Sequence, residues 1–318
     1  MDINKRTILW IVFSVSLVIL WNDWMVSTGK PSMFSPAPVA TLTTPDAKNG
    51  ASDLPASAAT TTAGGTSALP GSAPSSTEFK GELITITTDV IKADIGTLGG
   101  QVRRLELLQF KDGVDTEKNQ VLFGTAGART YLAQTGLIGS ASGAAFPNHN
   151  TGFTAQPGAR VLDNGNQVQL VLEAVQGGVK LTKTFTFKRG DYVIDVRHDV
   201  TNVGTVPIKP ELYLQLIHDG EKPVGESYFN SSYTGPTLYT DAEKYKKLTF
   251  EKIEKENKAQ LENPDRAFLP DHPTKADNGW FAISQHFFVS AFVPQGNTPR
   301  DIFTKKVDTN LYAIGNVL

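Results

Sequence analysis

The clearest pattern in the sequence is an alternation of apolar and polar residues beyond position 160. In the stretch "RVLDNGNQVQLVLEAVQGGVKLTKTFTFKRGDYVIDVRHDVTNVG", Val168, Leu170 and Leu172 fall on one side of an extended chain, and Gln167 and Gln169 fall on the other. Asn-Gly and Gly-Asp dipeptides interrupt the alternation where tight turns favour them. A period of two residues broken by turns predicts an antiparallel meander with one buried face.

The same character extends over most of the chain after Phe79. "ELITITTDVIKADIG" is rich in β-branched residues and ends at Gly96, and further strands are expected at 210–217, 247–253, 279–293 and 309–314. A helical period is suggested only at Asp241–Lys247, "DAEKYKK". We therefore predict a mainly β domain, a large antiparallel β-sandwich with more strands than an immunoglobulin domain.

The N-terminal segment has a different pattern, an uninterrupted apolar run. "KRTILWIVFSVSLVILWNDWM" is apolar from Thr7 to Val26 except for Asn22 and Asp23, and about 20 such residues span a bilayer as a helix. A cleaved secretion signal is the alternative, but its apolar region is shorter and ends in small residues. We therefore predict a retained transmembrane signal anchor.

The flanks of this run predict its orientation in a membrane. Trp21 and Trp24 suit the interfacial belt, where amphipathic rings lie at the level of the headgroups. Lys5 and Arg6 precede the run, so the positive-inside rule places residues 1–6 in the cytoplasm and the residues that follow the anchor outside.

A linker separates the anchor from the β domain. Residues 27–78 consist largely of Ala, Ser, Thr, Pro and Gly, a composition that cannot bury enough apolar surface to offset the entropy of ordering. The predicted organisation is thus a cytoplasmic N-terminus at 1–6, an anchor at 7–26, a disordered linker at 27–78 and a β domain at 79–318.

Composition excludes several classes of function. The chain carries 30 Lys and Arg against 32 Asp and Glu, a formal net charge of −2 without a basic stripe, so a nucleic-acid partner is not predicted. It contains no cysteine, which excludes disulfides, thiolate metal sites and thiol catalysis.

The histidines are the remaining candidates for acid–base or metal chemistry. A sugar-converting sandwich enzyme would need a histidine and a carboxylate flanking a cleft, but His198, His218 and His286 each lie in or at the end of an apolar strand pattern. None pairs with another at the spacing of metal ligands. We predict core or strand-end roles for all of them, and neither a catalytic residue, a metal nor a cofactor. The five are His149, His198, His218, His272 and His286.

Three short motifs invite functional interpretations that their contexts do not favour. "RGD" at Arg189–Asp191 joins two alternating strands, so it is predicted to be a hairpin turn and not an adhesion motif. "TLGGQ" at 97–101 precedes no helix and is not a phosphate loop. "YTDAEKYKKLTFEKIEKENK" is predicted to be a solvated face or a lysine-protected edge strand, with a partner surface as the alternative.

Several stretches resemble a known family. They are "MDINKRTILWIVFSVSLVILWNDW", "ADIGTLGGQVRRLELLQF", "FKRGDYVIDVRHDVTN", "YTDAEKYKKLTFEKI" and "GWFAISQHFFVSAFVP". Together with the order of anchor, linker and β domain, they resemble the N-terminal portion of the YidC family of membrane protein insertases of Gram-negative bacteria.

The resemblance implies a fold, a location and a function. The family's periplasmic domain is a β-supersandwich similar to sugar mutarotases, and its members assist the insertion, folding and assembly of inner-membrane proteins, alone or with the Sec translocon. Expected partners are nascent integral membrane proteins, the Sec translocon with its accessory proteins, and the lipid bilayer.

The sequence departs from the family pattern in one respect. The family's insertase core is a bundle of five further transmembrane helices around a polar groove, and no comparable apolar run follows Met25. We therefore expect the chain to be incomplete, with no functional residue of that core to carry over. The alternatives are a membrane-tethered carbohydrate-binding or mutarotase-like sandwich protein and an anchored docking module.

Overall fold

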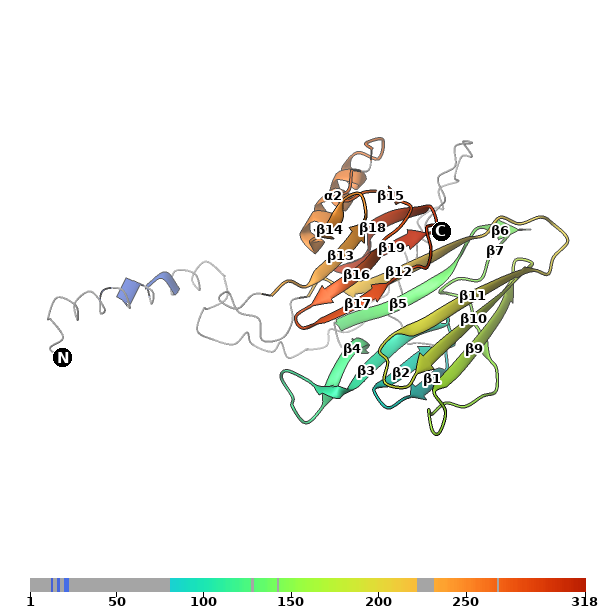
Figure 1. Ribbon diagram of the computed structural model, residues 1–318. Coiled ribbons are helices and arrows are strands. Elements are labelled where there is room, and N and C mark those ends of the chain that lie inside the picture. The colour runs from blue at the N-terminus through green and yellow to red at the C-terminus, as the bar shows by residue number, and fades with distance from the viewer. Residues whose placement is uncertain are drawn as a thin grey trace, which may run out of the picture. The chain divides into compact units, whose positions relative to one another are not determined.

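The computed structural model describes residues 81–318, apart from 127–128, 142, 222–231 and 268, together with six residues near the N-terminus (Figure 1). Those six residues are helical: Phe13, Ser16, Leu17, Leu20, Trp21 and Asn22. The predicted linker and the rest of the predicted anchor lie outside the described residues. Within the described part of the chain, no helix has both the length and the apolar character needed to cross a membrane.

A nine-stranded sheet is the largest sheet of the described domain. All its named strand pairs are antiparallel. Its strands, in spatial order, are β1 (Leu83–Thr87), β2 (Ile91–Gly96), β3 (Gln101–Lys111), β4 (Asn119–Ala126), β5 (Arg129–Ile138), β12 (Glu211–Asp219), β19 (Leu311–Val317), β18 (Arg300–Asp308) and β15 (Lys275–Ala276).

Two four-stranded sheets and a short hairpin complete the β structure. The first sheet contains β11 (Ile194–Asn202), β10 (Val179–Lys188), β9 (Gln167–Gln176) and β8 (Thr154–Ala155). The second contains β14 (Lys244–Lys247), β13 (Gly235–Thr240), β16 (Trp280–Gln285) and β17 (Phe288–Phe292). The hairpin pairs β6 (Ser140–Ala141) with β7 (Ala144–Ala145).

Both smaller sheets pack on the same face of the large one. Leu214 and Leu216 of β12 belong to a single buried cluster that includes Leu170 of β9 and Phe281 of β16. The cluster consists of apolar residues at alternate positions of the strands. Their burial removes one face of each strand from water. The fold is therefore mainly β and layered, as the alternation predicts.

The meander predicted beyond residue 160 is confirmed as β9, β10 and β11. Val168, Leu170 and Leu172 are buried, whereas Gln167 and Gln169 on the opposite face are exposed. The Arg-Gly-Asp motif joins β10 to β11, and Gly190 there has φ +68°, the left-handed region that favours glycine.

The helix predicted at 241–247 and the strand predicted at 247–253 are both wrong. Residues 244–247 form the edge strand β14, and the helix α2 spans Phe250–Glu262. Thr249 caps α2 by accepting a hydrogen bond from the Lys252 amide. The helix buries Phe250 and Ile253, one turn apart, and exposes its charged residues to water.

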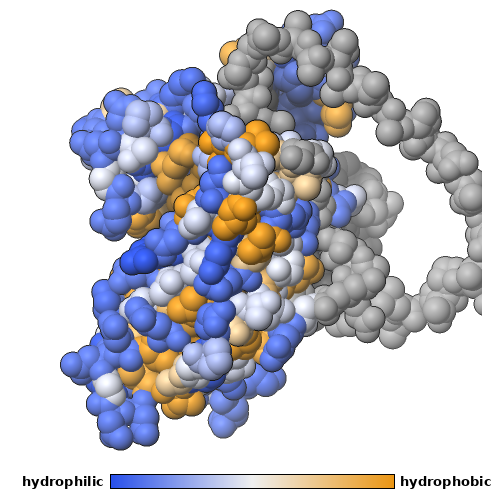
Figure 2. Space-filling view, turned by 90° about the vertical axis from the view of Figure 1, so that its right-hand side faces the viewer, coloured by the Kyte–Doolittle hydropathy of each residue, from blue (hydrophilic) through white to orange (hydrophobic). Residues whose placement is uncertain are grey.

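The single strand expected at 279–293 is a hairpin instead. β16 ends at Gln285 and β17 starts at Phe288, with His286 and Phe287 in the turn between them. The strands expected at 210–217 and 309–314 are confirmed as β12 and β19. On the face shown in Figure 2, hydrophobic residues form patches separated by hydrophilic ones, which is common on folded domains.

One charged side chain lies at the centre of the apolar layer. Lys183 of β10 is fully buried, with 0% relative exposure. Its Nζ donates hydrogen bonds to the carbonyl oxygens of Gly99 at 2.6 Å and of Thr135 at 2.8 Å, and lies 3.4 Å from that of Gly100. It also lies 4.8 Å from the centre of the Phe153 ring. Lys183 thus links the sheet of β8–β11 to the large one through hydrogen bonds.

The "TLGGQ" turn supplies two of these acceptors. Gly99 and Gly100 have φ values of +80° and +52°, which orient consecutive carbonyls toward the lysine. A Cβ at Gly99 would also clash with the backbone of His149. The lysine contacts and the close packing explain why glycines occupy positions 99 and 100, so no phosphate ligand is needed to account for them.

We predict that Lys183 makes stability depend on pH in the alkaline range. Burial lowers the pKa of its ammonium from 10.5 to about 7. Between these values the unfolded chain binds the proton and the folded chain does not, so the free energy of unfolding rises with pH. The difference in this free energy between wild type and Lys183→Met, from urea unfolding, should therefore increase from about pH 7 to about pH 9.5.

The matched control is Lys180→Met. Lys180 is on the opposite face of the same strand, and its Nζ lies 2.8 Å from Glu173 Oε1. The difference in the free energy of unfolding between wild type and Lys180→Met should stay constant from about pH 7 to about pH 9.5. Parallel curves for wild type and Lys183→Met would contradict the prediction.

Candidate functional site

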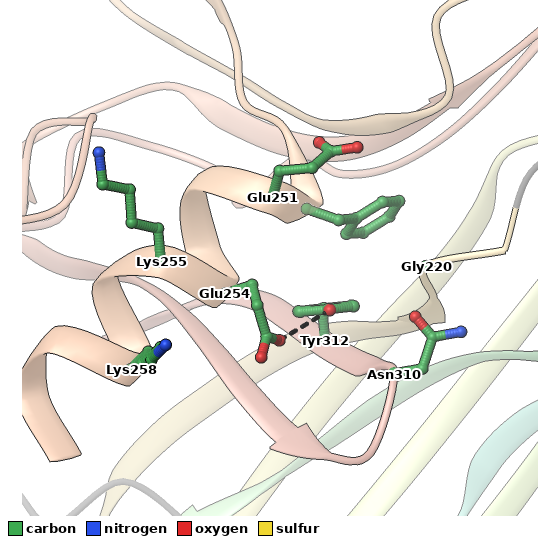
Figure 3. A pocket seen from close by; sticks show the side chains of 8 residues that line it. Gly220, Glu251, Glu254, Lys255, Lys258, Asn310 and Tyr312 are labelled. Atoms are coloured by element: carbon green, nitrogen blue, oxygen red, sulfur yellow. Dashed lines mark hydrogen bonds between the residues drawn. The ribbon is translucent and has the colours of Figure 1, made fainter. Parts of the chain in front are cut away.

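A surface pocket opens where α2 meets the ends of β12 and β19 (Figure 3). It encloses about 430 Å³. Side chains of both charges line it, beside two aromatic rings and the turns that follow β12 and precede β19. The lining residues are Gly220, Phe250, Glu251, Glu254, Lys255, Lys258, Asn310 and Tyr312.

The floor of the pocket is held by one carboxylate. Glu254 and Tyr312 point toward each other in Figure 3, and the Tyr312 hydroxyl donates to Glu254 Oε2 at 2.9 Å. Lys306 Nζ donates to the other oxygen of Glu254 at 2.7 Å. The ion pair with Lys306, followed by the hydrogen bond from Tyr312, lowers the pKa of Glu254. Burial, with a contribution from this carboxylate, raises the pKa of Tyr312 to about 12.

The rim of the pocket depends on a left-handed asparagine. Asn310, in the turn between β18 and β19, has φ +51°, a conformation that asparagine tolerates better than most residues. Its carbonyl accepts from the Gly220 amide at 3.1 Å, and its side-chain amide donates to Glu221 at 2.7 Å. The turn is thereby fixed against the end of β12.

A row of rings connects the pocket to the core. Centroid distances along the row are 4.3 Å from Phe123 to Tyr131, 4.8 Å from Tyr131 to His218, 5.5 Å from His218 to Phe250 and 5.1 Å from Phe250 to Tyr312. Aromatic pairs at these distances contribute beyond their buried area. The row therefore anchors the first turn of α2 to the large sheet.

Three of the five histidines, His149, His218 and His272, are buried, and His198 is half-buried on β11. His149 Nδ1 is 2.6 Å from the Tyr213 hydroxyl, and His198 Nε2 is 2.7 Å from the Thr135 hydroxyl. The ring of His218 contacts the Asp219 carbonyl and Gln285, and that of His272 contacts the Pro273 carbonyl and Thr304. His286 is instead exposed in the β16–β17 turn.

Burial keeps the interior rings neutral. It lowers the pKa of His198 to about 3, with the neighbouring Lys183 as a second cause. It also lowers the pKa values of His218 and His272. Neutral imidazoles engaged by hydroxyl and carbonyl groups suit structural hydrogen bonding. No group of three or more His, Asp or Glu among the described residues could hold a metal ion.

The predicted anchor residues are only partly described. Trp21 lies in a helical segment with more than half of its surface exposed. Lys5, Arg6 and Trp24 lie outside the described residues, so their membrane roles stay predictions. The pocket and the row of rings were not predicted, although Thr249 before the apolar pair Phe250 and Ile253 is a signal for a helix start.

Known proteins are similar to this chain over its β domain and, for the relatives below, over its whole length. Residues 83–318 match the sequence profile of a family described as "YidC periplasmic domain". A "Membrane protein insertase YidC" from Janthinobacterium sp. (strain Marseille) is 50% identical over 327 residues, covering 100% of this chain and 54% of that protein. A protein of the same description from Herminiimonas arsenicoxydans is 50% identical over 328 residues, with the same coverage.

A more distant relative shows similar coverage. The "Membrane protein insertase YidC" of Cupriavidus taiwanensis is 47% identical over 324 residues, covering 99% of this chain and 54% of that protein. The chain thus spans about half the length of the curated relatives that it matches.

We predict that Phe250→Ala releases α2 from the sheet without unfolding the domain. Truncating a buried phenylalanine in a core costs about 3–5 kcal/mol, and Phe250 joins the row of rings to the helix. Hydrogen exchange of the α2 amides should accelerate by about tenfold or more, equivalent to about 1.4 kcal/mol of local stability. Leu261→Ala, at an exposed position of the same helix, is the control and should change exchange little. Equal acceleration in β9–β11 would contradict the local role.

Proposed function

The chain belongs to the YidC family of membrane protein insertases, with residues 83–318 as its periplasmic domain, and we propose that it is the N-terminal portion of such an insertase. In this proposal the whole protein assists insertion, folding and assembly of integral inner-membrane proteins, alone or with the Sec translocon and its accessory proteins. The observation that carries it is the match over residues 83–318, supported by relatives at 50% identity that are described as insertases.

The proposed fold is a β-supersandwich similar to that of sugar mutarotases. A nine-stranded sheet with two four-stranded sheets on one face supports it. Within this fold we assign the domain a contact role and not an enzymatic one. Burial lowers the pKa values of His198, His218 and His272, and these rings and that of His149 are bonded inside the domain, which suits such a role.

The proposed topology places the domain in the periplasm. Residues 1–6 stay in the cytoplasm, 7–26 cross the inner membrane, 27–78 form a disordered tether and 79–318 form the periplasmic domain. Lys5 and Arg6 set the orientation, and Trp21 and Trp24 lie at the outer interface.

The pocket beside α2 is a candidate docking place for a protein partner. Its mixed charges and the aromatic Tyr312 match the polar, partly aromatic character of transient protein interfaces. The lysines of β14 and the mixed charges of α2 extend this surface. Their charges would increase the rate of encounter more than the affinity.

The orientation predicts the effect of reversing the N-terminal charges. Lys5→Glu combined with Arg6→Glu removes the positive charge next to the anchor, so the fraction of chains with the β domain outside should fall. Protease added to spheroplasts measures that fraction. Lys92→Glu, a reversal on an exposed position of β2, is the control and should leave it unchanged. Unchanged protease sensitivity in the double variant would contradict the assigned roles of Lys5 and Arg6.

The insertase proposal predicts a defect on depletion. Depleting the native protein from its own cells should slow membrane integration of newly made inner-membrane proteins, measured by pulse-labelling and alkali extraction. Export of a soluble periplasmic protein by the same cells is the control for general secretion. Integration at the normal rate after complete depletion would contradict the proposed function.

A further inference from the structure

One edge strand of the domain presents a continuous apolar stripe. β17 is the outer strand of its four-stranded sheet, and among the described residues it pairs only with β16. Its outward side chains are Val289 and Ala291, with Phe287 before them and Val293 after them on the same side. Phe287 is 87% exposed and Val289 is 57% exposed.

Two other edge strands of the domain carry charges on their outward positions. β14, at the opposite edge of the same sheet, has the sequence "KYKK". β11, at the edge of the other small sheet, turns Asp195, Arg197 and Asp199 outward, with ion pairs such as Lys188–Asp195 at 2.6 Å. Charged side chains on an edge prevent pairing with foreign strands. β17 lacks this protection.

The inner side of β17 is fixed to the domain by aromatic contacts. Phe292 packs 5.4 Å from Phe281 of β16, and Phe288 packs edge-on against Phe110 of β3 at 5.7 Å. Phe110 in turn lies 5.9 Å from Tyr192, beside β11. The outer edge of β17, which pairs with no other described strand, is therefore held in place by packed rings, which lowers the entropy lost on binding.

The turn that leads into β17 is strained. Phe287 has φ +71°, a left-handed conformation that is rare for a bulky residue. Such a conformation raises the energy of the turn. Here the strained residue is also the most exposed of the large apolar residues in the described chain. Burial of this ring by a partner would offset part of that cost.

We propose that the edge of β17 binds an extended apolar peptide segment, which adds a strand to the sheet. This inference rests on the proposed function, which supplies newly made apolar segments before they enter the bilayer. The segment would hydrogen-bond to the free backbone edge and lay alternate apolar side chains on Val289, Ala291 and Val293. An uncharged stripe disfavours an acidic or basic partner, because a charge placed there would lose hydration without an ion pair.

The length of the edge argues for a peptide and against a second copy of the chain. β17 spans five residues, and Pro294 after Val293 lacks the amide that would extend the ladder. Stable dimers bury about 1,000 Å² or more, which one such strand pair does not reach. A short edge suits transient binding, as expected for a segment that must be released.

The test uses the whole chain in lipid nanodiscs and a fluorescein-labelled peptide of alternating Val and Thr flanked by lysines. Fluorescence anisotropy against empty nanodiscs gives the affinity. Val289→Lys and, separately, Val293→Lys should weaken binding about tenfold or more. Val175→Lys is the matched control, because Val175 is 64% exposed on β9, and it should change the affinity less than about twofold. The same peptide, methylated at alternate backbone amides, should bind to the wild-type protein as weakly as the unmethylated peptide binds to Val289→Lys.

Three results would overturn the proposal. Equal binding by all variants would place the peptide elsewhere, and undiminished binding of the methylated peptide would exclude strand addition. A dimer seen by sedimentation, lost in Val289→Lys and accompanied by no peptide binding, would assign the edge to a second copy. If the peptide does not bind at β17 but depletion still slows membrane integration, the strand-addition proposal is wrong and the insertase proposal is unaffected.

Discussion

The architecture depends on one buried lysine. Lys183 reaches from the sheet of β8–β11 to the carbonyl oxygens of Gly99, Gly100 and Thr135 beside or in the large sheet. A lysine nitrogen without an ionic partner in an apolar layer is costly unless its N–H groups find acceptors. The carbonyls meet that need, and they can do so only where the layers have one separation and register. His198 strengthens this constraint, because its bond to the Thr135 hydroxyl ties the next strand to the same residue of β5.

The part of the domain around α2 is held by aromatic rings, whereas the part around β10 is held by Lys183. α2 has few apolar residues of its own, and buries only Phe250 and Ile253. Its position is set by the stack with His218 and by Glu254, which joins Tyr312 to Lys306. A helix that buries only its first turn and is otherwise held by ion pairs can shift more readily than a strand in a ladder. The pocket thus lies in a part of the domain that can adjust to a partner.

Sequence alternation could predict the strands but not the long-range contacts that place them. In "KLTKTFTFK" the period puts Lys183 on the same face as Leu181 and Phe185, so a buried lysine is readable from the pattern. Its acceptors are backbone carbonyls about 50 to 85 residues away, and no local rule predicts them. The error at 247–253 is different. Phe250 and Ile253 fit a helix as well as a strand, and the cap at Thr249 with the Glu- and Lys-rich residues that follow should have decided for the helix.

The distribution of charge distinguishes the interior of this domain from its working surfaces. Inside, Lys183 and His198 bond to carbonyl and hydroxyl oxygens, and burial lowers the pKa values of both. Outside, charge protects β14 and β11 but is missing from β17. An exposed neutral edge is a hazard to a folded domain, because it invites aggregation. Its persistence beside two protected edges is most simply explained if that edge has a partner, which makes contact, and not catalysis, the chemistry of this domain.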